Sequence, residues 1–505
     1  MSTEMPRIVL RPTGAELTAP KGTPLRDLLF EQGVEFPCGG NGRCRGCRVR
    51  VLEGSAPPND AQRALLSDHE IADGWRLACQ CRLEENLVIE LRQWDASILM
   101  DDSQFVFTPQ EGLGIAIDMG TTTLVAQLLD LSTGHVLGVK TALNPQARFG
   151  GDVMSRIQHA LTPGGQAQLQ EGIRREIGKL ARQLLAASQT DASLLRRAIV
   201  VGNTAMHHLF CGVDVEPLSH YPFEPVDYGL KTFTGAELGW ELGASTTVQF
   251  LPCLGGFVGS DVLAGMLATG IHTGEQLAGL VDLGTNGEIV LATRDRMMCA
   301  STAAGPAFEG ARISSGMRAS TGAIWKVTTL DHHMEVEVLG NAEPRGICGS
   351  GLVDAVAAGL DLGFIKPSGR LTTGDTLMVS EPVALSQCDV RQLQLAKGAI
   401  AAGIRLLLNR WGDGAPELTT LHLAGAFGNY VNRTSARRIG LLAFPEDQVK
   451  PVGNTALLGA KIALFSPDAE DGAYSAIRTR MEHVSLNEDP EFQDVYVDEM
   501  GFPAG

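Results

Sequence analysis

The chain has 505 residues, which is more than one compact core holds, and its length predicts roughly three domains. It carries 58 Asp and Glu against 41 Lys and Arg, a formal net charge of −17 that argues against general binding to nucleic acid or to an anionic membrane. Hydrophobic residues at 44% and charged residues at 20% exclude disorder throughout. The sequence shows neither a secretory leader nor an apolar stretch of membrane-spanning length, so we expect a cytoplasmic protein.

The ten cysteines divide into a cluster and five singletons. The singletons are typical of small buried hydrophobic residues. The clustered five lie within the first 81 residues: Cys38, Cys44, Cys47, Cys79 and Cys81. In a reducing compartment such a cluster indicates metal or redox chemistry rather than disulfide bonds.

The residues around these cysteines predict a small domain that ends near residue 93. Short strands are expected at 7–10, 16–19, 48–52 and 87–91, and a helix at 24–32. The loop at 36–47 contains four glycines, which let the backbone curl around a small group and present amide donors to it. Donors of this kind stabilise an electron-rich iron–sulfur cluster and tune its potential.

The cysteine spacing indicates which kind of metal site the cluster forms. Five residues separate Cys38 from Cys44, and two separate Cys44 from Cys47. Plant-type ferredoxins have four residues in the first gap, whereas this spacing and the segment RLACQCRL resemble ferredoxins of the adrenodoxin type. That resemblance implies a β-grasp, ferredoxin-like α+β domain whose 2Fe–2S cluster is held by Cys38, Cys44, Cys47 and Cys79, with Cys81 spare. A zinc site made from Cys44, Cys47, Cys79 and Cys81 is the alternative.

Arginines crowd the same loop: Arg43, Arg45, Arg48 and Arg50 fall within eight residues. They could form one solvated strand face. Alternatively, they form a basic collar that steers an acidic redox partner and raises the cluster potential.

After a linker at 94–110, the chain contains an internal repeat. Residues 114–130 and 279–292 each read as an apolar strand that ends in an aspartate, a Gly-Thr turn and a second strand. Asp118 and Asp282 are thereby expected to hold Mg²⁺ in a cleft, directly or through water. The two turns offer amides and hydroxyls to phosphate oxygens, and their residues are Gly120, Thr121, Thr122, Thr123, Gly284, Thr285, Asn286 and Gly287. A plain turn between two strands is the alternative for each turn taken alone.

A third glycine turn follows a strand at 420–424. In this order the three turns resemble the acetate kinase, sugar kinase, heat-shock chaperone and actin superfamily. The resemblance implies a duplicated, ribonuclease-H-like α/β ATPase body with halves at 111–278 and 279–467, and adenosine contacts at Gly425, Ala426 and Gly428. The stretch 347–354 resembles the start of that superfamily's connecting helix, with a plain helix cap as the alternative.

Joining a 2Fe–2S domain to this ATPase body resembles the reductive activators of corrinoid proteins, as do the stretches 144–157, 202–208, 304–310 and 452–459. The resemblance implies that ATP drives the return of an inactive Co(II) corrinoid protein of a methyltransferase system to Co(I). It also implies an electron donor that the sequence does not identify, and a homodimer.

Two other functions are compatible with the motifs. Activators of 2-hydroxyacyl-CoA dehydratases pair this ATPase fold with a 4Fe–4S cluster, but they bridge that cluster between subunits from within the fold. A nucleotide-dependent binding protein whose cluster only senses redox state is the other alternative.

The segment 468–505 holds ten acidic and two basic residues. A solvated tail is expected. The alternative is a segment that docks on the body through Phe492, Val495, Tyr496, Met500 and Phe502.

Overall fold

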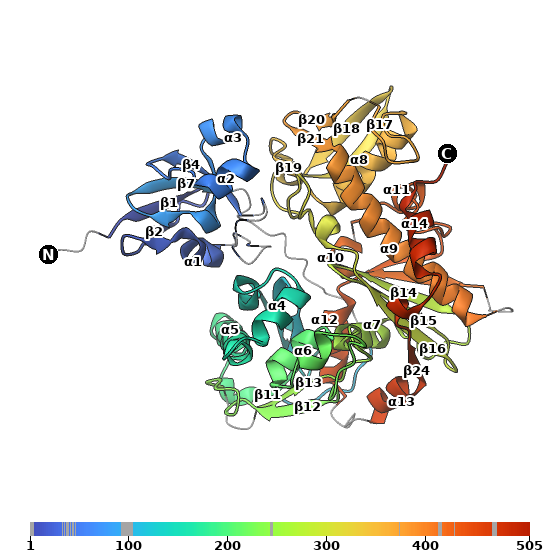
Figure 1. Ribbon diagram of the computed structural model, residues 1–505. Coiled ribbons are helices and arrows are strands. Elements are labelled where there is room, and N and C mark those ends of the chain that lie inside the picture. The colour runs from blue at the N-terminus through green and yellow to red at the C-terminus, as the bar shows by residue number, and fades with distance from the viewer. Residues whose placement is uncertain are drawn as a thin grey trace.

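The structure is a computed structural model that describes residues 5–32, 34, 36, 40, 42, 45, 47–91, 105–242, 246–372, 374–412, 417–428, 430–466 and 472–504. A ferredoxin-like module at the N-terminus lies beside a body of two lobes (Figure 1). Within the described ranges, each helix is too short or too polar to span a bilayer.

The ferredoxin-like module is a five-stranded sheet in the order β2-β1-β7-β4-β5. Its strands are β1 (Arg7–Arg11), β2 (Glu16–Thr18), β4 (Arg48–Glu53), β5 (Trp75–Leu77) and β7 (Leu87–Leu91), with a short pair β3 (Thr23–Pro24) and β6 (Arg82–Leu83). Its helices are α1 (Leu25–Leu29), α2 (Asp60–Leu65) and α3 (Asp68–Ala72), and single 3₁₀ turns occupy η1 (Phe30–Gln32) and η2 (Ala78–Gln80). Alternate residues of β1 and β7 are buried with the leucines of α1, which confirms the period-two strands predicted here.

The first lobe has a six-stranded sheet in the order β10-β9-β8-β11-β13-β12. Its strands are β8 (Leu113–Met119), β9 (Thr123–Asp130), β10 (Val136–Leu143), β11 (Leu195–Val201), β12 (Lys231–Thr234) and β13 (Thr247–Phe250). Its helices are α4 (Val153–Ala160), α5 (Gly165–Ala187), α6 (Thr204–Cys211) and α7 (Ser260–Thr269), with 3₁₀ turns η3 (Pro145–Arg148), η4 (Ala192–Leu194) and η5 (Glu216–Leu218). Residues of α4, α5 and α6 bury one face of this sheet.

The second lobe repeats this plan in a six-stranded sheet of order β23-β22-β14-β15-β16-β24. Its strands are β14 (Ala278–Leu283), β15 (Gly287–Ala292), β16 (Met297–Thr302), β22 (Thr420–Ala424), β23 (Val449–Gly453) and β24 (Met481–His483). In both lobes a hairpin and a third antiparallel strand come first, then a parallel strand that pairs with the hairpin's first strand and a second parallel strand beside it. The duplicated α/β body expected from the repeat is therefore confirmed.

Further elements of the second lobe surround this sheet. They comprise β17 (Ala323–Leu330), β18 (His333–Val338), β19 (Gly346–Ile347), β20 (Thr376–Ser380), β21 (Val383–Ser386), α8 (Gly349–Asp361), α9 (Gln387–Trp411), α10 (Gly425–Gly428), α11 (Arg433–Arg438), α12 (Thr455–Leu464), α13 (Gly472–Arg480), α14 (Phe492–Met500) and the turns η6 (Pro306–Glu309), η7 (Leu339–Asn341) and η8 (Leu486–Glu488). Helices α8 and α9 cover one face of the sheet and share its hydrophobic core.

The two lobes share a core where α7 of the first lobe packs on α12 of the second. A β-carbon at Gly459 of α12 would lie 2.0 Å from the carbonyl oxygen of Ala264, so only glycine allows this approach. The same core includes Ala116 and Ile199 of the first sheet and Leu280 of the second. The lobes are therefore joined at this helix pair.

The C-terminal segment is docked, so the expectation of a solvated tail is wrong. Strand β24 extends the second sheet beside β16, and α14 packs on α9. Gln394 of α9 donates to the carbonyl of Met500 at 3.0 Å, and the buried Lys397 donates to the carbonyl of Gly501 at 2.6 Å. The side chain of Phe502 is buried in the core of the second lobe. The apolar positions of the segment outweigh its charge because Val495 of α14 and Phe502, which follows this helix, are buried in the core of the second lobe.

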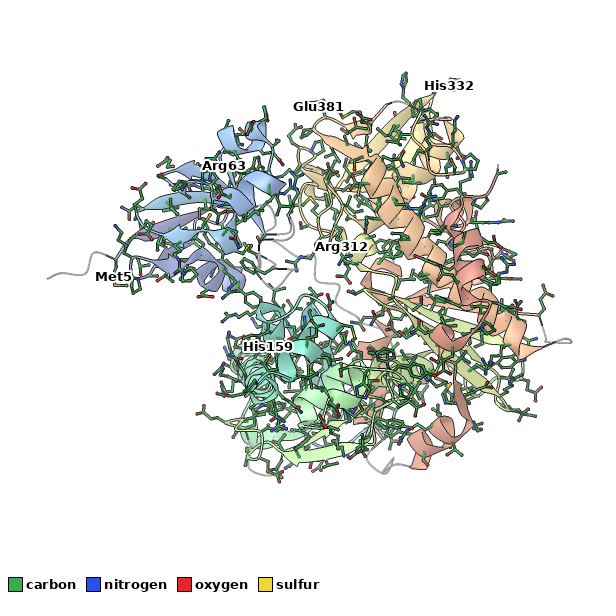
Figure 2. The ribbon with its side chains drawn as sticks, in the orientation of Figure 1. Met5, Arg63, His159, Arg312, His332 and Glu381 are labelled. Atoms are coloured by element: carbon green, nitrogen blue, oxygen red, sulfur yellow. The ribbon has the colours of Figure 1, made fainter. Side chains whose placement is uncertain are left out.

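The ferredoxin-like module contacts both lobes. Arg148 of the first lobe stacks over the ring of Phe30, with 4.7 Å between guanidinium and ring centre. From the second lobe, Arg345 donates to Glu90 Oε1 at 3.2 Å and to the carbonyl of Leu91 at 3.3 Å. Arg48 of the module donates to the carbonyl of Ser314 at 2.8 Å. We call these contacts of Arg148, Arg345 and Arg48 the bridging interface. Figure 2 labels Arg312 on the side of the second lobe that faces the module.

Candidate functional site

A cavity of about 1260 Å³ lies between the lobes and contains the predicted nucleotide residues. The ends of β8 and β14 place Asp118 and Asp282 in its wall. The predicted turn residues that line it are Gly120, Thr121, Thr122, Thr123, Gly284, Thr285, Asn286 and Gly425. The repeat therefore brings two hairpin turns to one cavity, as the sequence predicted.

Three side chains form hydrogen bonds with the first turn, at Gly120 and Thr121. The amide of Asn144 donates to the carbonyl of Gly120, and the amide of Asn203 donates to Thr121 Oγ1, both at 2.9 Å. Arg156 donates to the carbonyl of Thr121 at 2.5 Å. Arg156 is fully buried, and burial lowers its pKa to about 9. The turn is held rigid by these contacts.

Both turns keep backbone amides available. Among the described residues no acceptor is found for the amides of Thr121 and Thr122, while the carbonyl of Thr122 accepts from the amide of Asn144. The second turn is similar: the carbonyl of Thr285 is bonded to the amide of Gly305, and no acceptor within the described chain takes the amides of Thr285 and Asn286. Paired free amides of this kind form an anion-binding concavity.

Asp118, Asp261, Asp282 and Glu288 line the same cavity, and Glu176 and Glu309 line it as well. The first four are the carboxylates nearest the two predicted strand ends in sequence or in charge interaction. Burial raises the pKa of Asp118 to about 6 and that of Asp282 to about 7, the latter assisted by the charge of Asp118. Burial, with the charge of Asp282, also raises the pKa of Asp261 to about 7, and that of Glu288 lies well above its usual range. No Lys or Arg of the described chain forms a salt bridge with these four groups. These carboxylates favour divalent cations as companions of an anionic triphosphate, and Arg148, Lys179 and Arg318 line the same cavity.

The carboxylates do not form a protein cage for a metal ion. In the described ranges, no three His, Cys, Asp or Glu side chains converge to hold one. A cation at this site would share its coordination with phosphate oxygens and water, as Mg²⁺ commonly does. Asp118 Oδ2 also accepts a hydrogen bond from the amide of Asn454 at 2.8 Å, which fixes that carboxylate from the opposite lobe.

The third glycine turn approaches the second aspartate closely. Strand β22 lies parallel to β14 with Ala424 opposite Asp282. Gly425 has φ of +90°, and a β-carbon there would lie 2.7 Å from Asp282 Oδ1. Glycine is therefore required both for the backbone conformation and for the approach to the carboxylate. Nearby, Phe427 stacks on Phe308 with 4.8 Å between ring centres, giving the cavity an aromatic side.

Two predicted nucleotide residues of the described chain, Gly287 and Gly428, do not appear in the cavity wall. Gly287 is buried and faces α9, where a β-carbon would lie 2.8 Å from Ile400. A β-carbon at Gly428 would point at the backbone of Leu423, 3.1 Å away. The side chain of Ala426 lies outside the described residues. Helix α8 begins at the cavity, because Cys348, Gly349 and Ser350 line it. The hydroxyl of Ser350 does not cap α8 and donates to the carbonyl of Trp325.

Sequence reasoning assigned no role at this site to Asp261, Glu288, Asn454 and Arg156, nor to Asn144 and Asn203. Glu288 carried a signal, because it interrupts an apolar strand at the repeat position where the first hairpin has Leu124. Asp261 follows a glycine-rich run and begins α7. The roles of Asn454 and Arg156 depend on partners far away in the sequence, and no local pattern reveals them.

The iron–sulfur site is described in part. Cys38 and Cys44 lie outside the described residues, whereas Cys47 is buried and Cys79 is half-buried. The amide of Ala78 donates to the carbonyl of Cys47 at 3.0 Å, which joins the two ligand segments. Gly40 and Gly42 have φ of +77° and +65°, and β-carbons there would lie 2.8 Å from Arg26 and 2.7 Å from Gln80. The left-handed backbone favours glycine at these two positions, and the described thiols of Cys47 and Cys79 are of the type that holds an iron–sulfur cluster.

Cys81 belongs to the core of the module rather than to the loop. Its thiol is buried, donates to the carbonyl of Leu77 at 3.4 Å and accepts from the amide of Gln62 at 3.6 Å. Burial raises its pKa to about 11, so it stays protonated. These contacts favour Cys79 over Cys81 as a ligand.

The described arginines near the loop are engaged inside the protein. Arg45 and Arg48 both pair with Glu70, and Arg50 pairs with Asp73. Arg76 donates to the backbone carbonyls of 56, 71 and 75. Arg43, the remaining arginine of the loop, lies outside the described residues.

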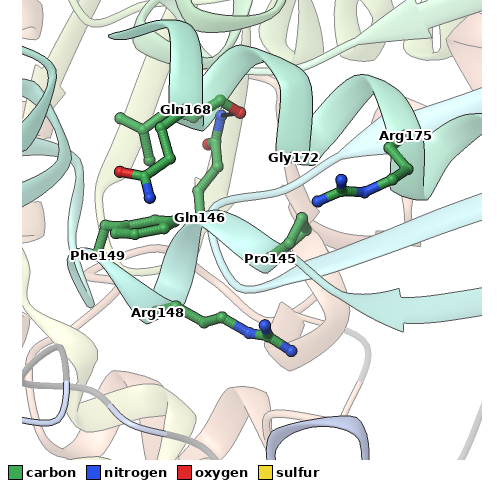
Figure 3. Close-up of a pocket in the computed structure, with 8 residues that line it drawn as sticks. Pro145, Gln146, Arg148, Phe149, Gln168, Gly172 and Arg175 are labelled. Atoms are coloured by element: carbon green, nitrogen blue, oxygen red, sulfur yellow. Dashed lines mark hydrogen bonds between the residues drawn. The ribbon is translucent and has the colours of Figure 1, made fainter. Parts of the chain in front are cut away.

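A smaller cavity of about 240 Å³ lies in the first lobe between η3 and α5 (Figure 3). Arg148 lines both this cavity and the large one, and it also carries the contact to Phe30 of the ferredoxin-like module. The short turn η3 therefore connects the module to the wall of the nucleotide cavity.

Comparison with known proteins agrees with this architecture. A model of a 2Fe–2S iron–sulfur cluster binding domain matches residues 8–84, the RACo middle region matches 113–274, and the C-terminal domain of RACo, the ASKHA domain, matches 276–505. The corrinoid activation enzyme RamQ of Eubacterium limosum is 35% identical over 76% of this chain and 69% of its own length. The chain belongs to the RACo family.

This RACo family member is also similar to two further proteins. The [Co(II) methylated amine-specific corrinoid protein] reductase of Methanosarcina barkeri is 29% identical over 77% of each chain. A solved structure titled as a reductive activator for a corrinoid, iron–sulfur protein matches with a TM-score of 0.70 and 28% identity, covering 99% of this chain and 98% of the other. The family models support iron–sulfur binding in the module and nucleotide binding in the body.

Proposed function

We propose that this RACo family member is an ATP-dependent reductive activator that returns the Co(II) form of a methyltransferase system's corrinoid protein to Co(I). The observation that carries the proposal is the shared cavity: Phe30 and Leu91 of the ferredoxin-like module line the same cavity as Asp118, Asp282 and Gly425. An electron-carrying domain is thus built into the wall of a nucleotide site. The names of the relatives supply the corrinoid partner.

The body would bind MgATP through both hairpins. The free amides of Thr121, Thr122, Thr285 and Asn286 would donate to phosphate oxygens, and Gly425 would admit the nucleoside. Asp118 and Asp282 would position Mg²⁺, which adds positive charge beside these carboxylates. Asp261, at the start of α7 in the same wall, is a candidate to orient the attacking water.

The module would hold its 2Fe–2S cluster with Cys38, Cys44, Cys47 and Cys79. The cluster supplies one-electron transfer when bound. The protein's part is to shield the ligands: Cys47 is buried, and the glycine loop closes over the side of the site that Gln80 faces.

The bridging interface provides the coupling between the two sites. Arg148 and Arg345 reach the module from opposite lobes, so the module spans the cavity between them. Closure of the lobes around a nucleotide changes the separation of these two anchors, and the module cannot keep both contacts unchanged. Nucleotide state would therefore select the position of the cluster domain, which lets ATP drive an electron transfer that is uphill for ordinary cellular reductants.

The test is anaerobic. Reduced protein is mixed with MgATP and the Co(II) corrinoid protein of a methyltransferase system, and the Co(I) absorption band is followed. The expected result is Co(I) formation that requires MgATP; absence of reduction, or reduction at the same rate without nucleotide, overturns the proposal. A separate low-potential electron donor and a homodimer are parts of the same proposal, and sedimentation of the purified protein tests the dimer.

A further inference from the structure

The side chain of Gln80 contacts both the fourth proposed cluster ligand and the glycine loop. Gln80 ends η2, directly after Cys79, and its amide nitrogen lies 3.6 Å from Cys79 Sγ. The same nitrogen lies 3.5 Å from the carbonyl of Gly40. A β-carbon at Gly42 would lie 2.7 Å from it. One amide group therefore fills the space between the ligand and the loop.

Helix α2 fixes which way this amide points. Asn59 caps α2 by accepting from the amide of Gln62 at 3.0 Å, so the carboxamide of Asn59 has one orientation. Its NH₂ group donates to Gln80 Oε1 at 3.2 Å. Since the oxygen of Gln80 is taken by this donor, its nitrogen must face the sulfur and the loop.

The segment that carries Cys79 is itself anchored. The fully buried Gln62 accepts from the amide of Leu77 at 2.8 Å through its oxygen. Its nitrogen donates to Cys81 at 3.6 Å. Gln62 thus fixes both ends of the turn η2, and Gln80 extends from a rigid support toward the ligand sulfur.

A donor on a ligand sulfur changes the energy of the two redox states unequally. A 2Fe–2S cluster becomes more negative on reduction, and the electron density gained is shared with its thiolate ligands. An N–H donor stabilises the more negative state more strongly, because hydrogen bonds to charged acceptors are the stronger ones. Hydrogen bonding to the sulfurs is one of the factors that set the potential of such clusters.

We infer that Gln80 is a positioning residue that raises the reduction potential of the cluster by donating to Cys79, with its amide also held by the carbonyl of Gly40. The inference rests on the proposed role of Cys79 as a ligand. It assigns a tuning function to a residue outside the four cysteines.

The test replaces Gln80 with methionine, which has a similar length and no N–H donor. The midpoint potential is measured by an anaerobic redox titration followed by electron paramagnetic resonance. The potential of Gln80→Met is expected to fall by about 59 mV, a tenfold change in a one-electron equilibrium. Asn59→Ser keeps a capping oxygen but removes the amide that orients Gln80, so a smaller shift in the same direction is expected. Gln32→Met is the matched control, because within the described part of the module Gln32 contacts neither Cys47 nor Cys79, and it should leave the potential unchanged.

The outcomes separate this inference from the proposed function. A wild-type protein without a 2Fe–2S spectrum overturns the ligand assignment itself. A normal wild-type spectrum with unshifted potentials in Gln80→Met and Asn59→Ser overturns only the tuning role, even if those variants melt at a lower temperature. If Gln80→Met does not retain its cluster, the shift in Asn59→Ser decides. No corrinoid protein or nucleotide enters these measurements.

Discussion

The contact between Arg345 and the ferredoxin-like module gives the sharpest prediction about coupling. Arg345 donates to Glu90 at 3.2 Å and to the carbonyl of Leu91 at 3.3 Å, and its side chain is 23% exposed against 31% for Glu90. In the proposed closure the lobes move relative to this anchor, so we expect the contact to favour the nucleotide-free arrangement. Arg345→Ala is therefore expected to tighten nucleotide binding.

The expected change in the free energy of nucleotide binding can be worked out from the Arg345–Glu90 contact. An exposed ion pair is worth up to about 1 kcal/mol, and hydrogen bonds to charged groups are worth about 1.5–3 kcal/mol before screening. For this partly exposed pair we expect about 1.4 kcal/mol, which corresponds to about a tenfold lower Kd. The change is an upper limit, because closure need not break the whole contact.

The assay is isothermal titration calorimetry of the nucleotide with Mg²⁺ present. The control is Arg294→Ala, which removes an exposed pair with Glu275 at 2.8 Å, far from the bridging interface, and it should leave Kd unchanged. An affinity that is unchanged or weaker in Arg345→Ala, while the control behaves as expected, would refute the idea that the module opposes closure.

The remaining predictions concern the two sites. Cys81→Ser should keep the visible spectrum of the cluster, whereas Cys79→Ser should lose it; equal loss in both would contradict the ligand choice. Gly425→Ala should raise KM for ATP at least tenfold, because the new methyl group would collide with Asp282; an unchanged KM would show that the turn is not at the nucleotide. The pKa of Asp282 is raised to about 7, so without nucleotide the folded state binds more protons than the unfolded state between about pH 4 and 7. This group's contribution to stability is thus present at low pH and lost as pH rises through 7, and Asp282→Asn should flatten the fall of Tm between pH 5 and 8. A slope identical to that of the wild type would mean that this carboxyl does not titrate as described.

Much of the nucleotide site could be predicted because its chemistry is local. An aspartate at the end of an apolar strand and the Gly-Thr turn after it are neighbours in sequence and in space, so the repeat placed both hairpins correctly. The role of Cys47 as a cluster ligand stays a prediction. The residues that complete the site act across long sequence distances: Asn454 reaches Asp118 over 336 positions.

The errors have physical causes as well. Charge alone suggested a free tail at 468–505, but Val495 and Phe502 lie on one side of the last turns and are buried against α9. Gly287 occupies a repeat position equivalent to Thr123, yet it faces Ile400 because the second hairpin packs against a helix that the first lobe lacks at that point. The contact between module and body could not be predicted, since Arg345 and Glu90 carry no pattern that relates them.

The most direct test of the account is a single-turnover experiment that follows both redox centres at once. Protein with a reduced cluster is mixed with one equivalent of Co(II) corrinoid protein, and the electron paramagnetic resonance signal of the cluster and the absorbance of Co(I) are recorded over time. With MgATP, the loss of the cluster signal should match the gain of Co(I) in rate and in amount, and without nucleotide neither should change. Co(I) that forms while the cluster stays reduced, or that forms equally fast without MgATP, would contradict ATP-driven electron transfer from the cluster to cobalt.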